Sequence, residues 1–263
     1  MKDIYKKLDE IDKRYLHKLD IYDLIELNHN DMYDFINRIN INGYNSSVDG
    51  TIIDIRSSGN FNYKAAFSKV NIVSDSDNDI YLGTGIGLIL IKGLDENYEE
   101  VEEIIVMNGT TSVQSVYTYS RIYDGLCYNA GNDNGYCAGN ITCSGDNNNF
   151  FTIKAGEPFY LGIGSYTVPA NKSFILKSLR IKCEKNSEID IYQMLAAYNL
   201  PPQSKLKITS SDDSAIFELT ALIPEKTDLW FRAIRTGGTG NKKVSVGFSG
   251  YLIDDSKLYK INY

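Results

Sequence analysis

The sequence predicts a mainly β protein: an antiparallel β-sandwich, with a jelly roll as its leading form, preceded by a short α-helical segment. Two observations lead to this fold class. Apolar residues recur with a helical period only near the amino terminus, and later apolar runs are short and separated by Gly, Asn, Asp and Ser. About a dozen such runs without intervening helices favour two packed antiparallel sheets. We expect residues 1–42 to form the helical segment and residues 43–263 the β-sandwich domain.

The helical expectation covers residues 1–40. Ile4, Leu8, Ile11 and Tyr15 are spaced by four, three and four residues, which places them on one face of a helix, and charged residues fill the positions between them. This face can pack on the β-domain of the same chain or dock on a partner. The pattern leaves both alternatives open.

The β-domain begins where turn signals such as Asn-Gly and Asp-Gly appear. Apolar and charged residues alternate within Leu179–Glu184, and Val244–Phe248 alternates in the same way, as expected of strands with one buried face. The candidate strands are Thr51–Arg56, Ala65–Val73, Ile80–Lys92, Val101–Met107, Val113–Ile122, Ala138–Cys143, Phe150–Ile153, Phe159–Gly164, Phe174–Cys183, Ile189–Ala197, Ala215–Ile223, Leu229–Ile234 and Val244–Ile253.

Charge and hydropathy exclude two classes of partner. The formal net charge is -7, and Lys and Arg are scattered among Asp and Glu, so we expect no nucleic acid as a partner. The first residues are charged and lack the apolar core of a signal peptide, and no apolar run approaches the length of a membrane span. We therefore expect a soluble protein that is made in a cytoplasm and does not enter a membrane.

No catalytic centre stands out. His17 and His29 are the only histidines, and both lie in the segment expected to be helical. A Ser/His/Asp or Cys/His centre in the β-domain would therefore need one of these two histidines from the amino-terminal segment. Four glutamates crowd one segment and would project from both faces of a strand there, which fits a solvated edge better than a glycosidase pair. These glutamates are Glu99, Glu100, Glu102 and Glu103.

The cysteines do not form a metal motif. Three of them are separated by nine and five intervening residues, whereas paired zinc ligands are two to four residues apart. Buried free thiols are the default interpretation, and a disulfide between Cys127 and Cys143 across a Gly- and Asn-rich hairpin is the alternative. The four cysteines are Cys127, Cys137, Cys143 and Cys183.

Two further motifs fail on particular residues. Asp75, Asp77 and Asp79 alternate like the start of an EF-hand loop, but Ile80 stands where that loop needs Gly, so we expect an acidic turn. A glycine series lies inside an apolar run with no following helix to hold a phosphate, which argues against a nucleotide site. Its members are Gly83, Gly85 and Gly87. We expect no catalytic residue, no cofactor and no bound metal.

Three segments share a recurring pattern of strands and turns: IKGLDENYEEVEEIIVMNGTTSV at 91–113, YTVPANKSFILKSLRIKC at 166–183 and SVGFSGYLID at 245–254. Together they resemble virion structural proteins of marine tailed bacteriophages of the cyanophage and pelagiphage type. The stretch CAGNIT at 137–142 is similar to a hairpin of the same proteins. The resemblance covers about residues 50–255 and leaves the amino-terminal segment outside.

The resemblance implies a place in a particle and no enzymatic activity. We expect a capsid-associated decoration or minor capsid protein of a tailed-phage virion, present as a homo-oligomer and anchored to capsid, neck or tail proteins through its amino-terminal segment. The alternative is a tail-associated protein that binds a receptor or glycan on the host surface. Its exposed Tyr and Asn would lie in loops such as Tyr128–Tyr136 and Asn147–Asn149.

Overall fold

The computed structural model describes residues 36–57, 60–63, 67–130, 136–146, 148–156, 163–184, 188–197, 200–210 and 214–258. This part of the chain is mainly β, and its strands pair antiparallel, as the sequence predicts. The elements are β1 (Ile36–Val48), β2 (Ile53–Asp54), β3 (Ser68–Ser74), β4 (Ile86–Leu94), β5 (Glu100–Val106), β6 (Val113–Tyr119), β7 (Arg121–Ala130), β8 (Ile141–Gly145), β9 (Asn148–Ile153), β10 (Ser165–Thr167), β11 (Lys172–Cys183), β12 (Glu188–Ala197), β13 (Gln203–Ser210), β14 (Ser214–Ile223), β15 (Thr227–Gly237), β16 (Lys242–Asp254) and the short helix α3 (Asp255–Leu258).

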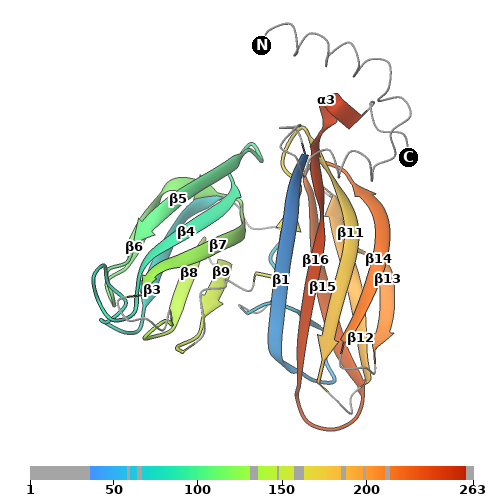
Figure 1. Ribbon diagram of the computed structural model, residues 1–263, viewed down its shortest axis with the longest axis horizontal. Coiled ribbons are helices and arrows are strands. Elements are labelled where there is room, and N and C mark those ends of the chain that lie inside the picture. The colour runs from blue at the N-terminus through green and yellow to red at the C-terminus, as the bar shows by residue number, and fades with distance from the viewer. Residues whose placement is uncertain are drawn as a thin grey trace, which may run out of the picture.

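The strands form two lobes (Figure 1). The framework lobe contains β1, β2 and β10 to β16, and the inserted lobe contains β3 to β9, which lie between β2 and β10 in the chain. The framework lobe has one sheet in the order β1-β16-β11-β14 and another in the order β10-β15-β12-β13, with the short β2 beside β15. The inserted lobe has sheets β6-β3-β8-β9 and β5-β4-β7.

Strand pairing in the framework lobe is nested. Its first long strand, β1, pairs with its last, β16, and the next pairs inward are β10 with β15, β11 with β14 and β12 with β13. Alternation explains how the same strands bury one face: Leu179, Ile181 and Cys183 are buried, while Arg180 and Lys182 are exposed. The alternation predicted for this strand is therefore confirmed.

Each lobe has a hydrophobic core, and the core of the framework lobe also includes Leu94 and Tyr123 of the inserted lobe. In the framework lobe, side chains from both sheets share one cluster, with Phe174 and Phe248 from one sheet and Tyr166 and Phe231 from the other. In the inserted lobe, a second cluster joins residues such as Ile72 and Phe151 to Ile89 and Ile105 across its two sheets. Two cores of this kind make each lobe a packed unit.

The chain enters and leaves the inserted lobe at one crossing point. Gly43 on β1 forms an isolated bridge with Ile163, and a Cβ atom added to Gly43 would lie 2.2 Å from the carbonyl oxygen of Ile55. Gly164 has a φ of 64° and faces the same carbonyl oxygen, also at 2.2 Å from an added Cβ. Glycine is needed at both positions because the backbones approach too closely for a side chain.

The prediction that the amino-terminal helical segment extends through residue 40 is wrong at its carboxyl end. Residues 36–40 belong to strand β1, which crosses the expected boundary between residues 42 and 43. The physical reason is the alternation in Ile39-Asn40-Ile41-Asn42, in which Ile41 is buried and Asn40 and Asn42 are exposed. Pairing with β16 over the length of β1 stabilises the strand. The rest of the helical prediction, including His17 and His29, lies outside the described residues.

Other strand boundaries also shift. The expected strand Ile80–Lys92 begins only at Ile86, because the preceding residues form turns, and the expected strand Val113–Ile122 is divided between β6 and β7 at Ser120. The sequence did not predict β13 or the helix α3. Most of the expected strand Phe159–Gly164 lies outside the described residues.

Candidate functional site

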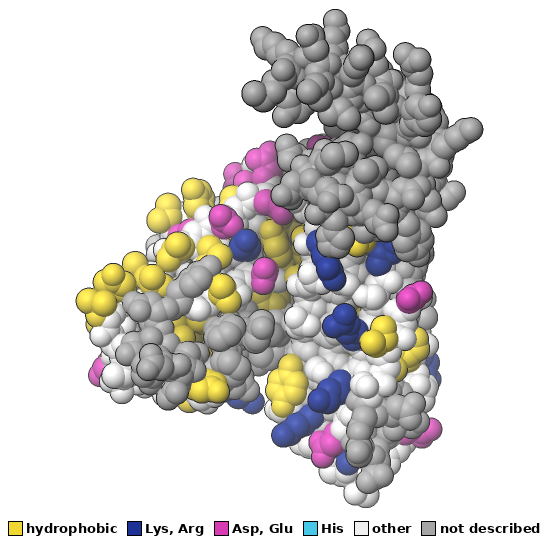
Figure 2. Space-filling model, viewed as in Figure 1, with side chains coloured by type: hydrophobic (Ala, Val, Ile, Leu, Met, Phe, Trp, Pro, Cys, Tyr) yellow, Lys and Arg dark blue, Asp and Glu magenta, His cyan; other side chains and the backbone are white. Residues whose placement is uncertain are grey.

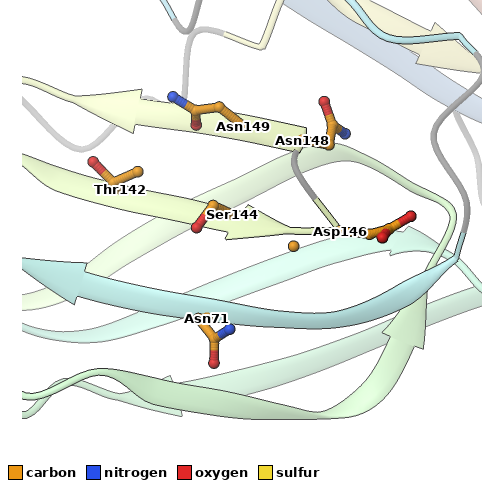
Figure 3. A pocket seen from close by; sticks show the side chains of 7 residues that line it. Asn71, Thr142, Ser144, Asp146, Asn148 and Asn149 are labelled. Carbon is orange, nitrogen blue, oxygen red and sulfur yellow. The ribbon is translucent and has the colours of Figure 1, made fainter.

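A polar pocket opens on the outer face of the sheet β6-β3-β8-β9 in the inserted lobe (Figure 3). Its volume is about 490 Å³. The inward side chains of β8, Ile141 and Cys143, are buried in the core, so the alternating residues Thr142 and Ser144 face outward. The lining residues are Asn71, Thr142, Ser144, Gly145, Asp146, Asn148 and Asn149.

The pocket offers amide, hydroxyl and carboxylate groups. The Nδ2 atom of Asn149 donates to Oγ1 of Thr152 at 3.0 Å, while its Oδ1 atom is buried and has no hydrogen-bond partner within the described residues. Asp146 lies in the turn between β8 and β9 with a φ of 43° and is exposed. Neutral amides and hydroxyls recognise a ligand that both donates and accepts hydrogen bonds, such as a polyol.

This pocket meets the sequence-based expectation only in part. Asn148 and Asn149 belong to the Asn-rich loop that the sequence singles out for glycan binding, while Asn147 lies outside the described residues. None of the described lining residues is aromatic, and Tyr136, from the loop Tyr128–Tyr136, is not among them. Residues 131–135 of that loop lie outside the described part of the chain. No local pattern singles out Asn71 or Ser144, because sheet pairing alone brings them together.

Asp79 is an organising residue of the loop before β4. Its carboxylate is fully buried and accepts four hydrogen bonds. Oδ1 accepts from the backbone N–H groups of Ile86 at 2.8 Å and Ala138 at 2.9 Å. Oδ2 accepts from the N–H of Gly139 at 2.8 Å and the hydroxyl of Ser74 at 2.6 Å. These bonds compensate for the loss of water around a buried charge and tie three loop segments together.

The two neighbouring aspartates make separate contacts. Asp75 accepts from the backbone N–H of Asn140 at 2.7 Å and from its side-chain amide at 2.6 Å. Asp77 accepts from the hydroxyl of Thr110 at 2.6 Å. The three acidic side chains therefore diverge toward different loops, and the acidic turn predicted here is confirmed. No cluster of His, Cys, Asp and Glu among the described residues could hold a metal ion.

The crowded glutamates also make separate contacts. Glu100 is in an ion pair with Lys172 of the framework lobe, and Glu102 pairs with Lys92 at 3.4 Å. The carboxylate of Glu103 accepts from the hydroxyl of Tyr119 at 2.9 Å and from the backbone N–H of Val116 on β6, also at 2.9 Å. Because β5 is an edge strand, the solvated-edge interpretation is confirmed.

All four cysteines are buried thiols outside any disulfide. Cys127 lies on β7 and Cys143 on β8, and these strands belong to different sheets, so the two residues do not face each other across a hairpin. Burial raises the pKa of the Cys127 thiol and that of the Cys143 thiol well above the usual value. The free-thiol prediction is confirmed, and the alternative disulfide is wrong.

A buried ion pair joins the two lobes and was not predicted. Arg121 on β7 donates through Nε to Oδ1 of Asp228 on β15 at 2.9 Å and through Nη2 to Oδ2 at 3.1 Å. Each side chain is less than a tenth exposed. The hydroxyl of Thr167 donates to the same carboxylate at 2.6 Å, and Nη2 also donates to the carbonyl oxygen of Tyr63 at 2.6 Å. The bidentate geometry, together with the hydrogen bonds to Thr167 and to the carbonyl oxygen of Tyr63, compensates for the burial of both charges.

No protein-family model matches the chain, and no curated protein matches it. Similar solved structures include the globular domain of zebrafish complement 1qA protein, at 14% identity and a TM-score of 0.23 over 40% of this chain and 79% of that one. A structure of infectious bursal disease virus, Gt strain, is 9% identical with a TM-score of 0.24, over 84% and 73% of the two chains. The PBSX exported protein XepA is 10% identical with a TM-score of 0.19, over 83% and 86%.

At TM-scores this low, these likenesses carry no argument about function. The similarity to virion proteins of marine phages stays a prediction from the sequence. No helix among the described residues is long and apolar enough to span a membrane.

Proposed function

We propose that the chain is a non-enzymatic structural component of a tailed-phage virion, most simply a capsid-associated decoration protein, whose framework lobe is a jelly-roll β-sandwich. The observation that carries this proposal is the nested pairing of eight strands, first with last and inward to the fourth with the fifth. That order arises when one long antiparallel hairpin is rolled into two facing sheets. Jelly rolls of eight strands serve as capsid and lectin domains.

The inserted lobe supports a role in assembly. It is attached by both ends to one point of the framework lobe and is held against that lobe by the buried pair of Arg121 and Asp228. A second lobe held in this way can present a surface away from the framework sheets (Figure 1). Exposed apolar residues on its strands, such as Ile104 and Val106, are of the kind that interaction surfaces use.

The anchoring role of the amino-terminal segment is part of the same proposal. The framework strand β1 begins at Ile36, so the segment available for docking is residues 1–35. A deletion that ends at residue 35 leaves β1 complete, whereas a deletion through residue 40 removes part of its pairing with β16. The first deletion is therefore the clean test of anchoring.

Particle composition tests the proposal. Mass spectrometry of gradient-purified virions should find the full-length chain, and a chain lacking residues 1–35 should fold with an unchanged thermal midpoint but be lost from the particles. Absence of the full-length chain from the virions overturns the particle role. Incorporation of the truncated chain at the full-length level overturns anchoring alone.

A glycan-binding role is the second candidate, and the polar pocket of Figure 3 favours it. The hydroxyl of Ser144 and the side-chain amide of Asn149 belong to its lining, and the Oδ1 atom of that amide has no hydrogen-bond partner among the described residues. A glycan array should show binding that is lost in the double variant Ser144→Ala, Asn149→Ala. The matched control is Asn97→Ala, an exposed asparagine of the same lobe outside the pocket. Absence of binding on the array, or equal loss in the control, contradicts the glycan-binding role.

A further inference from the structure

The outer face of the sheet β5-β4-β7 is apolar along one half and acidic along the other. Strand register places Ile104 beside Leu90 and Leu90 beside Leu126, and Val106 follows next to Leu88. Ile104 and Val106 are 58% and 52% exposed, so the apolar half meets water at the edge strand. We call this surface the β5 face.

The acidic half of the β5 face is the next row of the same sheet. Glu102 and Asp124 stand on either side of Lys92, and both carboxylates are exposed. The row therefore bears one more negative than positive charge. An apolar surface with an acidic margin suits a partner that is apolar with a basic margin.

The two lobes carry opposite net charge. Residues 57–162, which contain the inserted lobe, have 13 Asp and Glu against 5 Lys and Arg. Residues 36–56 and 163–263, which contain the framework lobe, have 12 Asp and Glu against 16 Lys and Arg. Figure 2 shows hydrophobic and acidic side chains over the inserted lobe and Lys and Arg over the framework lobe. A molecule with this polarity attracts a second copy in head-to-tail orientation.

The framework lobe offers a groove of the complementary kind. It lies on the outer face of the sheet β1-β16-β11-β14 and has a volume of about 500 Å³. Gly247 forms its floor, because no side chain stands between Asn42 and Arg180 in the paired row. Arg180 and Lys182 are exposed on one side, next to Ile216, which is 69% exposed. We call this surface the β11 groove.

We propose that the β5 face of one copy of this chain docks on the β11 groove of a second copy. Ile104 and Val106 would pack against Ile216, and the acidic row would approach Arg180 and Lys182. A symmetric contact of two β5 faces would instead bring two acidic lobes together, which like-charge repulsion opposes. The charge difference between the lobes therefore favours the head-to-tail contact. The proposal holds whether or not the chain is a virion component.

A head-to-tail dimer has a free β5 face at one end and a free β11 groove at the other. Such a contact closes into a ring where the rotation between copies permits it and otherwise grows into a filament. Association should weaken as salt is added, because part of the attraction is between exposed charges.

Two variants disable the surfaces separately. Ile104→Lys places a cation on the β5 face, and Lys182→Glu places an anion in the β11 groove. Both sites are exposed, so the fold should be unchanged, as circular dichroism and thermal melting will show. The matched controls are Val116→Lys, on the other sheet of the inserted lobe and 73% exposed, and Lys154→Glu, an exposed lysine outside the groove.

Sedimentation velocity of the purified full-length chain is the measurement. The wild type and both controls should associate with rising concentration, and each of the two variants should stay monomeric. An equimolar mixture of Ile104→Lys and Lys182→Glu should form dimers and nothing larger, since one intact β5 face and one intact β11 groove remain in each pair.

Three outcomes overturn the proposal. The first is a wild-type chain that is monomeric at about 1 mM, where even a weak specific contact is populated. The second is association of either variant at the wild-type level. The third is a mixture that stays monomeric while the wild type associates, which would indicate a symmetric contact or another surface. Loss of the chain from virions leaves all three measurements unaffected, so the two proposals fail separately.

Discussion

Both lobes enclose a hydrophobic core between antiparallel sheets, but different contacts hold the strands of each lobe together. The framework lobe joins strands that are far apart in the chain, and its outermost pair, β1 and β16, contains residues such as Ile36 and Ile253. The inserted lobe pairs only strands that lie between residues 68 and 153, such as β4 with β5 and β3 with β8, and it places Asp79 in a buried position with four hydrogen bonds to hold its loops. Long-range pairing dominates the first lobe, and polar ties support the second.

The two kinds of contact determine which substitutions destabilise each lobe most. Removal of one apolar contact from the framework lobe leaves a continuous ladder of backbone hydrogen bonds in place. Removal of one carboxylate from the inserted lobe leaves several buried donors without partners, which costs more than the bond itself contributes. The junction between the lobes combines both risks, because Arg121 and Asp228 are each buried.

The largest expected effect is at that junction. Arg121→Met should lower the free energy of unfolding by about 3–5 kcal/mol, because it leaves the Asp228 carboxylate buried without its cation. It should also separate the unfolding of the lobes. Urea unfolding followed by the fluorescence of Trp230, the single tryptophan, reports the framework lobe, and far-ultraviolet circular dichroism reports both lobes.

Arg232→Met is the matched control for the junction. Arg232 pairs with the buried Asp54 at 2.7 Å inside the framework lobe, so its loss should also destabilise the protein but should leave the unfolding of the two lobes coincident. Separate unfolding in Arg232→Met, or coincident unfolding by both probes in Arg121→Met, would contradict the special role of the junction.

The next effect separates the aspartates of the inserted lobe. Asp79→Ala should cost about 2–4 kcal/mol, because four donors lose a buried acceptor. Asp77→Ala should cost under about 0.5 kcal/mol, because its one bond to Thr110 is exposed. Thermal melting of both variants checks the difference, and similar midpoints would refute the organising role of Asp79.

A smaller effect concerns acid stability of the framework lobe. Burial opposes ionisation of Asp190, but hydrogen bonds from Lys207 and Thr209 outweigh it and lower the pKa of Asp190 below its usual value. Its contribution is therefore present above the unfolded pKa of about 3.9 and is lost as pH falls through the lower folded value. Asp190→Asn should lose under about 1 kcal/mol at pH 7, since Lys207 is half exposed.

The pH profile provides the test for Asp190. The difference in unfolding free energy between Asp190→Asn and the wild type should shrink as pH falls below the unfolded pKa and through the lowered pKa of the native carboxyl. A difference that is constant between pH 7 and pH 2 would show that the variant acts through packing and not through charge.

The smallest effect requires no change in stability. The four thiols should resist alkylation in the native protein, because they are buried and because burial raises the pKa of Cys127 and of Cys143. All four should react in denaturant, as mass spectrometry will count. In Arg121→Met, Cys127 and Cys143 of the inserted lobe should react at a lower urea concentration than Cys183 of the framework lobe. Rapid labelling of the native wild type would show that the inserted lobe opens locally.

Sequence patterns predicted the framework strands well where side chains alternate. The alternation around Ile181 and Val246 matches the observed burial, and the antiparallel β class followed from it. The same logic failed at β1, where a helical reading was carried past Ile36 although Ile39 and Ile41 already alternate with asparagine. No local pattern in the sequence predicts that β1 and β16 pair, because the two strands lie at opposite ends of the described chain.

The inserted lobe was harder to predict. Its division into a second lobe depends on which strands share a core, and the apolar runs look alike in both lobes. The acidic turn was identified correctly, but the four bonds of Asp79 come from residues up to 60 positions away. The pocket at Ser144 and Asn149 and the pair of Arg121 and Asp228 likewise depend on long-range placement.

The close approach of Gly43, Ile55 and Gly164 makes the inserted lobe a unit that can be exchanged as a whole. The first and last residues of the inserted lobe lie close together, so the lobe is connected to the framework lobe at a single place. Exchange of this lobe for another β-domain with adjacent ends would leave the framework ladder intact, provided that Asp228 is changed together with Arg121 and that the apolar contacts of Leu94 and Tyr123 with the framework core are replaced. Variation in surface specificity can therefore accumulate in one lobe while the other keeps its architecture.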